Sequence, residues 1–139
     1  MIYLPGYKIL EKIHQSENTI IYRAAKENIP VIIKTNAINS SGNFEFNQLK
    51  YEFEILKSIQ HECIVKPINF EVYGNRAFLI LEDIQAFSLA QIHEDNISYS
   101  VFLDIALKIL SGLSEIHKKN IIHHSIRPEN IIYNFETKE

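Results

Sequence analysis

Lys34 lies near the end of an apolar-rich segment, Pro30–Thr35, whose preceding residues Val31, Ile32 and Ile33 are all apolar. A lone ammonium group in apolar surroundings needs an anionic partner, because burial otherwise favours its neutral form. Glu52 offers a carboxylate from a following segment in which apolar residues recur at helical spacing. A helix laid across a sheet can aim that carboxylate at a strand. We therefore expect a buried Lys34–Glu52 ion pair; the alternative is an exposed lysine and an unrelated surface glutamate.

A second polar set lies between two pairs of isoleucines, at 121–122 and 131–132. The segment between them carries His123, Ser125, Arg127 and Asn130. Apolar pairs on both sides predict a polar loop that is held at each end by buried, strand-like segments.

The spacing of apolar residues predicts the strands and the helix that position Lys34. Apolar-rich segments at Tyr7–Ile13, Thr19–Ala25 and Pro30–Thr35 are separated by polar links, which predicts a three-stranded antiparallel meander. A helix ending near His61 follows, and one stripe of it is apolar: Phe46, Leu49, Phe53, Leu56 and Ile59.

Two more strands and a long helix complete the predicted order. Ile68–Tyr73 and Arg76–Glu82 flank Gly74 and Asn75, and the leading glycine suits the first central position of a type II′ hairpin turn. The long helix spans Ser98–Lys118. Its predicted core stripe contains Val101, Phe102, Ile105, Ile109, Leu113 and Ile116.

Composition limits the possible classes of protein. The 139 residues are 46% hydrophobic and 22% charged, which is enough for one packed domain or a piece of one. A net charge of -3 argues against binding to nucleic acid or to an anionic membrane surface. No apolar run approaches the roughly 20 residues that span a bilayer. A single cysteine, Cys63, fits a reducing, cytoplasmic setting.

With these elements in order, the chain resembles the protein kinase family. The loop at 121–132 is similar to the family's His-Arg-Asp-Leu-Lys-Pro-Glu-Asn motif between apolar pairs, with His123 and Pro128-Glu129-Asn130 in matching places. Val31-Ile32-Ile33-Lys34 resembles the Val-Ala-Ile-Lys strand. Phe78–Asp83 resembles the fifth strand running into the hinge, with Leu81 at the gatekeeper position. The opening, Leu4-Pro5-Gly6-Tyr7, looks most like the N-terminal kinase-like domain of bacterial multidomain sensor proteins that carry a histidine kinase.

The resemblance implies an α+β fold that covers part of a kinase domain. Residues 1–84 would form the small lobe and hinge, with a five-stranded antiparallel sheet and one helix. Residues 85–139 would form a partial large lobe with the hinge-following helix, the long helix, the catalytic loop and the next strand. Because the sequence stops before an Asp-Phe-Gly turn, the long helix is expected to lack partners and to expose apolar surface, which favours self-association.

The resemblance also implies ATP-dependent phosphoryl transfer of the serine/threonine type, with ATP and Mg²⁺ as cofactors and a protein substrate or a regulated partner domain. Lys34 would contact the nucleotide phosphates, Glu52 would orient Lys34, and Asn130 would hold one Mg²⁺ in a nucleotide-sized cleft. The adenine would lie between Ile13, Ile21 and Ile32, near the gatekeeper Leu81, with its edge on the hinge backbone from Glu82 to Ile84. Ordinary core packing is the alternative for the three isoleucines.

Several positions depart from the family pattern. Ser125 stands where the catalytic aspartate is expected, and a hydroxyl is a poor proton acceptor at neutral pH. Arg127 replaces the loop lysine and keeps its charge. His124 is a possible substitute base, but in an extended loop it would point away from the Ser125 side. Three glycine positions of the phosphate loop hold His14, Ser16 and Thr19, and Ile32 replaces an alanine beside the adenine.

These departures leave two hypotheses open. The first is a fragment of a serine/threonine protein kinase domain, expected to be inactive in isolation because Ser125 replaces the catalytic aspartate and the metal-binding turn is absent. The second is a pseudokinase, a regulatory or protein-binding module without transfer activity. A third idea, a histidine metal site, lacks the cysteine or well-spaced carboxylate that would complete a tetrahedral ligand set.

Overall fold

The computed structural model describes residues 2–37, 43–92 and 97–138 and divides into two compact units. The first unit contains Met1–Ser58 and Val65–Asp83, and the second contains Ile59–Ile64 and Ile84–Glu139. The predicted boundary between residues 84 and 85 lies close to this division, but the short segment Ile59–Ile64 belongs with the second unit.

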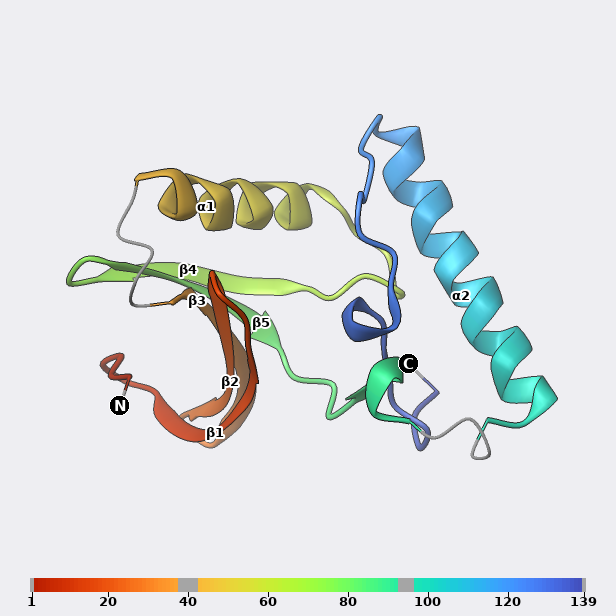
Figure 1. Ribbon diagram of the computed structural model, residues 1–139, viewed down its shortest axis with the longest axis horizontal. Coiled ribbons are helices and arrows are strands. Elements are labelled where there is room, and N and C mark those ends of the chain that lie inside the picture. Colours follow the sequence, from red (N-terminus) through yellow and green to blue (C-terminus); the bar gives the residue numbers. More distant parts are fainter. Residues whose placement is uncertain (1, 38–42, 93–96, 139) are drawn as a thin grey trace. The chain divides into compact units, whose positions relative to one another are not determined.

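Five antiparallel strands form the sheet of the first unit (Figure 1). Their order in the sheet is β1-β2-β3-β5-β4, and the five-stranded antiparallel sheet that the resemblance implied is confirmed. Gly74 in the β4–β5 turn has φ = 60°, the positive value that the turn prediction requires there. The strands are β1 (Lys8–Gln15), β2 (Thr19–Lys26), β3 (Ile29–Asn36), β4 (Pro67–Tyr73) and β5 (Arg76–Glu82).

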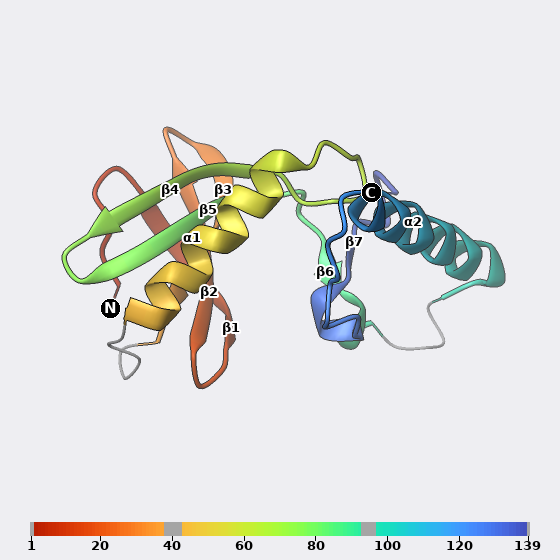
Figure 2. The same cartoon turned by 90° about the horizontal axis from the view of Figure 1, so that it is seen from above.

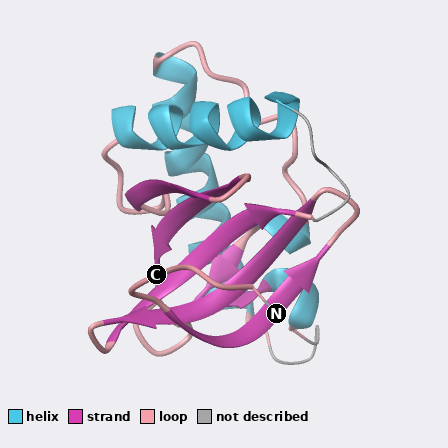
Figure 3. Ribbon diagram, turned by 90° about the vertical axis from the view of Figure 1, so that its left-hand side faces the viewer, coloured by secondary structure: helices cyan, strands magenta, loops and turns pink. Residues whose placement is uncertain are grey.

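Each face of the sheet has its own apolar cluster. On one face, the N-terminal residues Ile2 and Leu4 pack with residues of β2, β3 and β5, including the fully buried Ile33 and Ile80. On the other face lies helix α1 (Asn43–Ser58), which crosses the sheet in Figures 2 and 3. Leu49 of this helix is buried against the strand β5. Lys34 is therefore on a strand whose second face is covered by the helix that carries Glu52.

The second unit is built around α2 (Tyr99–Lys118), and Ser98 caps its N-terminus by accepting a hydrogen bond from the Val101 amide. Two short strands, β6 (Phe87–Ser88) and β7 (Ile132–Tyr133), pair with each other. Two 3₁₀ turns, η1 (Leu89–Gln91) and η3 (Pro128–Asn130), adjoin them. The long helix and the strand after the loop were both predicted.

One side of α2 is covered and the other is open. Gly112 lies against the backbone and side chain of Cys63, where an added Cβ would approach the Cys63 carbonyl oxygen to 3.6 Å. Ile105 and Ile116 of the predicted stripe are buried, but Phe102 is 57% exposed, so its assignment to the core was wrong. The described residues contain no helix that is both long and apolar enough to cross a membrane.

Candidate functional site

Lys34 and Glu52 form the expected ion pair. Burial alternates along β3, so Val31, Ile33 and Thr35 face the first cluster while Lys34 faces α1. The Lys34 ammonium donates to both carboxylate oxygens of Glu52, at 2.8 Å to Oε1 and 2.7 Å to Oε2. The two side chains are 25% and 33% exposed, so the pair is partly solvated and not buried as we had expected. At such exposure an ion pair contributes about 1 kcal/mol or less to stability, so its geometry matters more than its energy.

Apolar packing fixes the position of Glu52. Leu49 lies three residues before it on α1 and is buried against Ala77 and Leu79 of β5. Residues three apart share a helix face, so the contact that buries Leu49 also turns Glu52 toward the sheet. Phe53 and Leu56 extend the same contact.

A small polar pocket borders the ion pair. Its volume is about 30 Å³, which suits a water-sized group, not a nucleotide. This pocket is therefore too small to be the nucleotide-sized cleft that we expected beside Lys34. Thr19, at one of the glycine positions of the family, contributes to its wall. The lining residues are Asn18, Thr19, Lys34, Asn36, Gln48, Leu49 and Glu52.

The strand register places the predicted adenine residues beside Lys34. Ile21 of β2 lies opposite Lys34, and Leu81 of β5 lies opposite Ile32. Directly opposite residues point to the same face of a sheet, so Ile21, Ile32 and Leu81 share the face of Lys34. Ile21 and Ile32 are half-buried and belong to neither apolar cluster of the described residues, whereas Leu81 packs against the cluster under α1. Ile13 of β1 is 36% exposed.

The predicted hinge begins where β5 ends. The Glu82 amide donates to the Lys66 carbonyl at 3.0 Å, and the Glu82 carboxylate accepts from the Lys66 amide at 2.7 Å. Ile84 belongs to the second unit, where its carbonyl accepts a hydrogen bond from Asn134 at 2.7 Å. Each end of this segment is thus held within its own unit.

In the second unit the predicted catalytic loop is organised around Ser125. The Asn130 carboxamide donates to both the carbonyl and the hydroxyl oxygen of Ser125, each at 3.0 Å. His123 Nδ1 accepts a hydrogen bond from the Ser125 amide at 3.3 Å. Arg127 is exposed and extended, directly before η3. The structure brings Ser125 and Asn130 together and leaves Arg127 at the surface.

Two expectations about this loop were wrong. Ile122 and Ile132 are 66% and 39% exposed, so they are not buried ends of the loop. Backbone hydrogen bonds hold the loop instead, as the Leu89 amide donates to the Ile131 carbonyl at 2.9 Å. His124 has φ = 62°, a left-handed conformation. The reasoning that an extended backbone turns the His124 side chain away from the Ser125 side therefore does not apply.

The described residues fit a magnesium ion poorly. Mg²⁺ prefers a set of oxygen ligands that includes carboxylates. Asn130 offers one neutral carboxamide oxygen, and Ser125 offers a hydroxyl in place of a carboxylate. Across residues 2–37, 43–92 and 97–138, no group of three or more His, Cys, Asp or Glu side chains gathers in one place.

Comparison with known proteins tests the resemblance directly. The protein kinase domain family matches residues 7–139, which is nearly the whole chain. The chain belongs to the protein kinase family. Its sheet, helix α1, Lys34–Glu52 pair and following loop are thus the front part of a kinase domain.

Individual relatives are serine/threonine-protein kinases. CLA4 of Candida albicans is 29% identical over 135 residues, which is 92% of this chain and 14% of the relative. The kinase shk1/pak1 of Schizosaccharomyces pombe is 28% identical over 133 residues, or 94% of this chain and 20% of the relative. The kinase pkn2 of Myxococcus xanthus is 28% identical over 85 residues, or 60% of this chain and 10% of the relative. The chain spans a fifth or less of each of these relatives.

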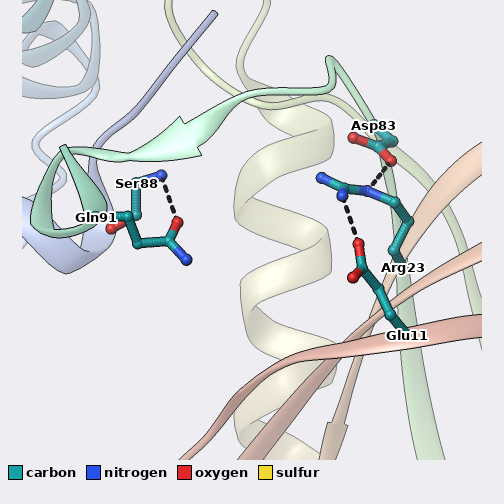
Figure 4. A network of polar contacts seen from close by, with 5 residues as sticks. All are labelled: Glu11, Arg23, Asp83, Ser88 and Gln91. Carbon is teal, nitrogen blue, oxygen red and sulfur yellow. Dashed lines mark hydrogen bonds and ion pairs between the residues drawn. The ribbon is translucent and has the colours of Figure 1, made fainter.

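Sequence reasoning missed a polar network next to the predicted hinge. Arg23 of β2 contacts Glu11 of β1 and Asp83, the residue that follows β5 (Figure 4). The available signal in the sequence was an arginine within a predicted strand. Its partners become evident only from the strand register and from the path of the chain after β5, which the sequence pattern does not supply.

Proposed function

We propose that this chain binds ATP as part of a serine/threonine-type protein kinase domain. The observation that carries the proposal is the Lys34 ammonium, which contacts both oxygens of Glu52 at 2.8 and 2.7 Å. A lysine held in one rotamer by a carboxylate can present its charge to a phosphate without losing further side-chain freedom. Ile21 and Ile32 provide half-exposed apolar surface on the same sheet face for the adenine ring.

Phosphoryl transfer is proposed to be impaired. In kinases a carboxylate orients the substrate hydroxyl and accepts its proton, and Ser125 occupies that position. A serine hydroxyl is neutral at pH 7, and the Ser125 hydroxyl already accepts a hydrogen bond from Asn130. Arg127 and Asn130 would then contribute charge and positioning only.

A second candidate function is a pseudokinase module that regulates an attached or partner protein without transferring phosphate. Ser125 favours this alternative, and so do His14, Ser16 and Thr19, because side chains at glycine positions restrict the approach of the phosphates to the backbone. Transfer of phosphate to a protein substrate would identify the first function. A protein partner that responds to bound nucleotide, without such transfer, would identify the second.

Nucleotide titration tests the proposed binding. Isothermal titration of the 139-residue chain with ATP, in the presence and absence of Mg²⁺, should show saturable binding. Lys34→Met should weaken that binding at least about tenfold, the loss expected for a charge-assisted phosphate contact. Lys50→Met is the matched control, because Lys50 is an exposed residue of the same helix that carries Glu52. Equal affinity of the Lys34→Met variant and the unsubstituted chain would contradict the proposal.

We also propose that the open side of α2 mediates self-association of this chain. Its apolar residues are well exposed: Tyr99 at 76%, Phe102 at 57%, Leu103 at 42%, Leu107 at 67% and Leu110 at 62%. Contiguous apolar surface of this kind favours association in water. Sedimentation velocity should show a concentration-dependent dimer, and Leu107→Lys with Leu110→Lys should abolish it. A monomer at high concentration would contradict this proposal.

The wider setting is a proposal too. The opening Leu4-Pro5-Gly6-Tyr7 supports a place at the N-terminal side of a bacterial sensor protein that carries a histidine kinase, in the cytoplasm. The genomic sequence that flanks this chain tests the assignment. A downstream nucleotide-binding regulatory module and histidine kinase would support it, and unrelated flanking sequence would contradict it.

A further inference from the structure

Arg23 links three segments of the first unit. From β2, its Nε donates to Asp83 Oδ2 at 2.7 Å and its Nη1 donates to Glu11 Oε1 at 2.6 Å (Figure 4). Glu11 lies opposite Arg23 in the register of β1 and β2, and Asp83 is the first residue after β5. We call Glu11, Arg23 and Asp83 the Arg23 network.

The network has two ion pairs, Arg23–Asp83 (the Asp83 arm) and Arg23–Glu11 (the Glu11 arm), and they differ in burial. The Asp83 side chain is 2% exposed, the Arg23 side chain 29%, and the Glu11 side chain 56%. A carboxylate removed from water requires strong donors, so the Asp83 arm depends on the guanidinium. The Glu11 arm is solvated and contributes little. A planar guanidinium can donate to both carboxylates at once, whereas a lysine ammonium lacks this fixed fork geometry.

The network lies at one end of the surface proposed for the adenine. Arg23 is opposite Ile32 in the β2–β3 register and two residues after Ile21 on β2. All three therefore belong to the sheet face of Lys34. Arg23 is therefore the neighbour of both half-exposed isoleucines on this face, and its guanidinium contacts the residue at which the chain leaves β5.

The same network holds the chain as it leaves β5. The Glu82 amide donates to the Lys66 carbonyl at 3.0 Å, and one residue later the Asp83 carboxylate is bound by Arg23. Successive residues are thus fixed by contacts to different segments, one to the residue before β4 and one to β2. A backbone held in this way keeps its amide and carbonyl groups oriented without a ligand.

We propose that Arg23 is a positioning residue for recognition of the nucleotide base. It fixes the backbone at Asp83, beside which the adenine edge would bond, and it bounds the apolar surface of Ile21 and Ile32. The inference rests on the proposed nucleotide binding and adds to it a specific prediction: Arg23 contributes to affinity for the base and not to affinity for the phosphates.

The affinities of two ligands, one that contains the base and one that consists of phosphates alone, test whether Arg23 acts on the base only. Isothermal titration of the 139-residue chain would use ATP and inorganic tripolyphosphate, each with Mg²⁺. Arg23→Met should weaken ATP binding about tenfold, the effect of about 1.4 kcal/mol at 25 °C, and leave the tripolyphosphate affinity unchanged. Glu11→Gln is the matched control on the exposed arm and should change neither affinity by more than about twofold.

Each outcome supports or overturns the inference. ATP binding by the unsubstituted chain, with equal ATP affinity in Arg23→Met, overturns the role of Arg23 and leaves the proposed function standing. No ATP binding by the unsubstituted chain overturns both. A similar loss for ATP and tripolyphosphate indicates general damage to the unit and also overturns the inference. If Arg23→Met does not fold, Arg23→Lys supplies the same test, because it keeps the charge and should lose affinity for ATP alone.

Discussion

Tyr133 donates its hydroxyl to the Asp104 carboxylate at 2.8 Å and thereby joins strand β7 to the N-terminal half of α2. Lys108, one turn later on the helix, donates to the same carboxylate oxygen at 2.9 Å. Tyr133 is 3% exposed, and its ring also packs edge-on against Phe135. This contact fixes the strand that follows the Ser125 loop, so the geometry of the loop depends on a tyrosine hydroxyl and a carboxylate outside it.

Alkaline pH should loosen the second unit through Tyr133. Burial, followed by the hydrogen bond to Asp104, raises the pKa of Tyr133 from 10.0 to about 12. The folded state therefore favours the protonated hydroxyl. The stabilisation is complete below pH 10 and is lost as the pH rises from 10 through about 12. Thermal melting between pH 8 and 12 should show this decline.

Tyr133→Phe is the matched variant for the alkaline experiment. It keeps the ring and removes the ionisable hydroxyl, so its melting temperature should be lower at pH 8 but should fall less steeply above pH 10. Parallel alkaline declines for Tyr133→Phe and the unsubstituted chain would show that other groups cause the loss.

Acidic pH should weaken the same contact through Asp104. The hydrogen bonds from Lys108, and then from Tyr133, lower the pKa of Asp104 below its ordinary 3.8. The stabilisation from this carboxylate is present above its unfolded-state pKa and disappears as the pH falls through the folded-state pKa. The difference in melting temperature between Asp104→Asn and the unsubstituted chain should therefore be larger at pH 6 than at pH 2. An equal difference at both values would contradict the assignment.

The sequence predicted the sheet well because its signals are local. The apolar-rich segment of β3 and the Gly74 turn specify a strand and a hairpin within a few residues, and the observed strands begin and end within two residues of the prediction. The exposure of Phe102 was not predictable in this way. Helical spacing identifies an apolar stripe, but which part of the stripe is covered depends on segments that are distant in the sequence.

The candidate site was predictable where a charge requires a partner. Lys34 in an apolar strand called for a carboxylate, and Glu52 is in contact with it. The conformation of the Ser125 loop was harder to predict, because a left-handed residue such as His124 reverses the direction assumed from an extended chain. The Arg23–Asp83 contact escaped prediction because it joins residues that are 60 positions apart.

Leu49→Ala tests how much the packing of α1 on the sheet stabilises the first unit. Leu49 is 3% exposed and contacts the β5 side of the sheet, so truncation should lower the free energy of unfolding by about 2 to 5 kcal/mol. Chemical denaturation measures the loss. Tyr51→Ala on the same helix, where Tyr51 is 69% exposed, is the control and should change stability by less than about 0.5 kcal/mol. Similar losses for both substitutions would contradict the burial pattern.

Ser125→Asp tests whether the missing carboxylate limits phosphoryl transfer. The side chain would restore a negative charge at the position where the family orients and deprotonates the substrate hydroxyl, and general-base groups contribute about 10² to 10⁴ in rate. The assay is transfer of radiolabelled phosphate from ATP to a generic protein substrate by the full-length protein that contains this chain. We expect the unsubstituted protein to be near background and Ser125→Asp to be faster by about a hundredfold or more.

Ser125→Asn is the control for that experiment, because it matches aspartate in size and carries no charge. It should leave the rate near background, since neither an amide nor a hydroxyl accepts a proton well at neutral pH. Asn130→Ala in the Ser125→Asp background should then lower the rate, because Asn130 contacts residue 125 through two hydrogen bonds. Robust transfer by the unsubstituted protein would show that Ser125 does not impair catalysis, and equal rates for Ser125→Asp and Ser125→Asn would show that charge at this position is not what the domain lacks.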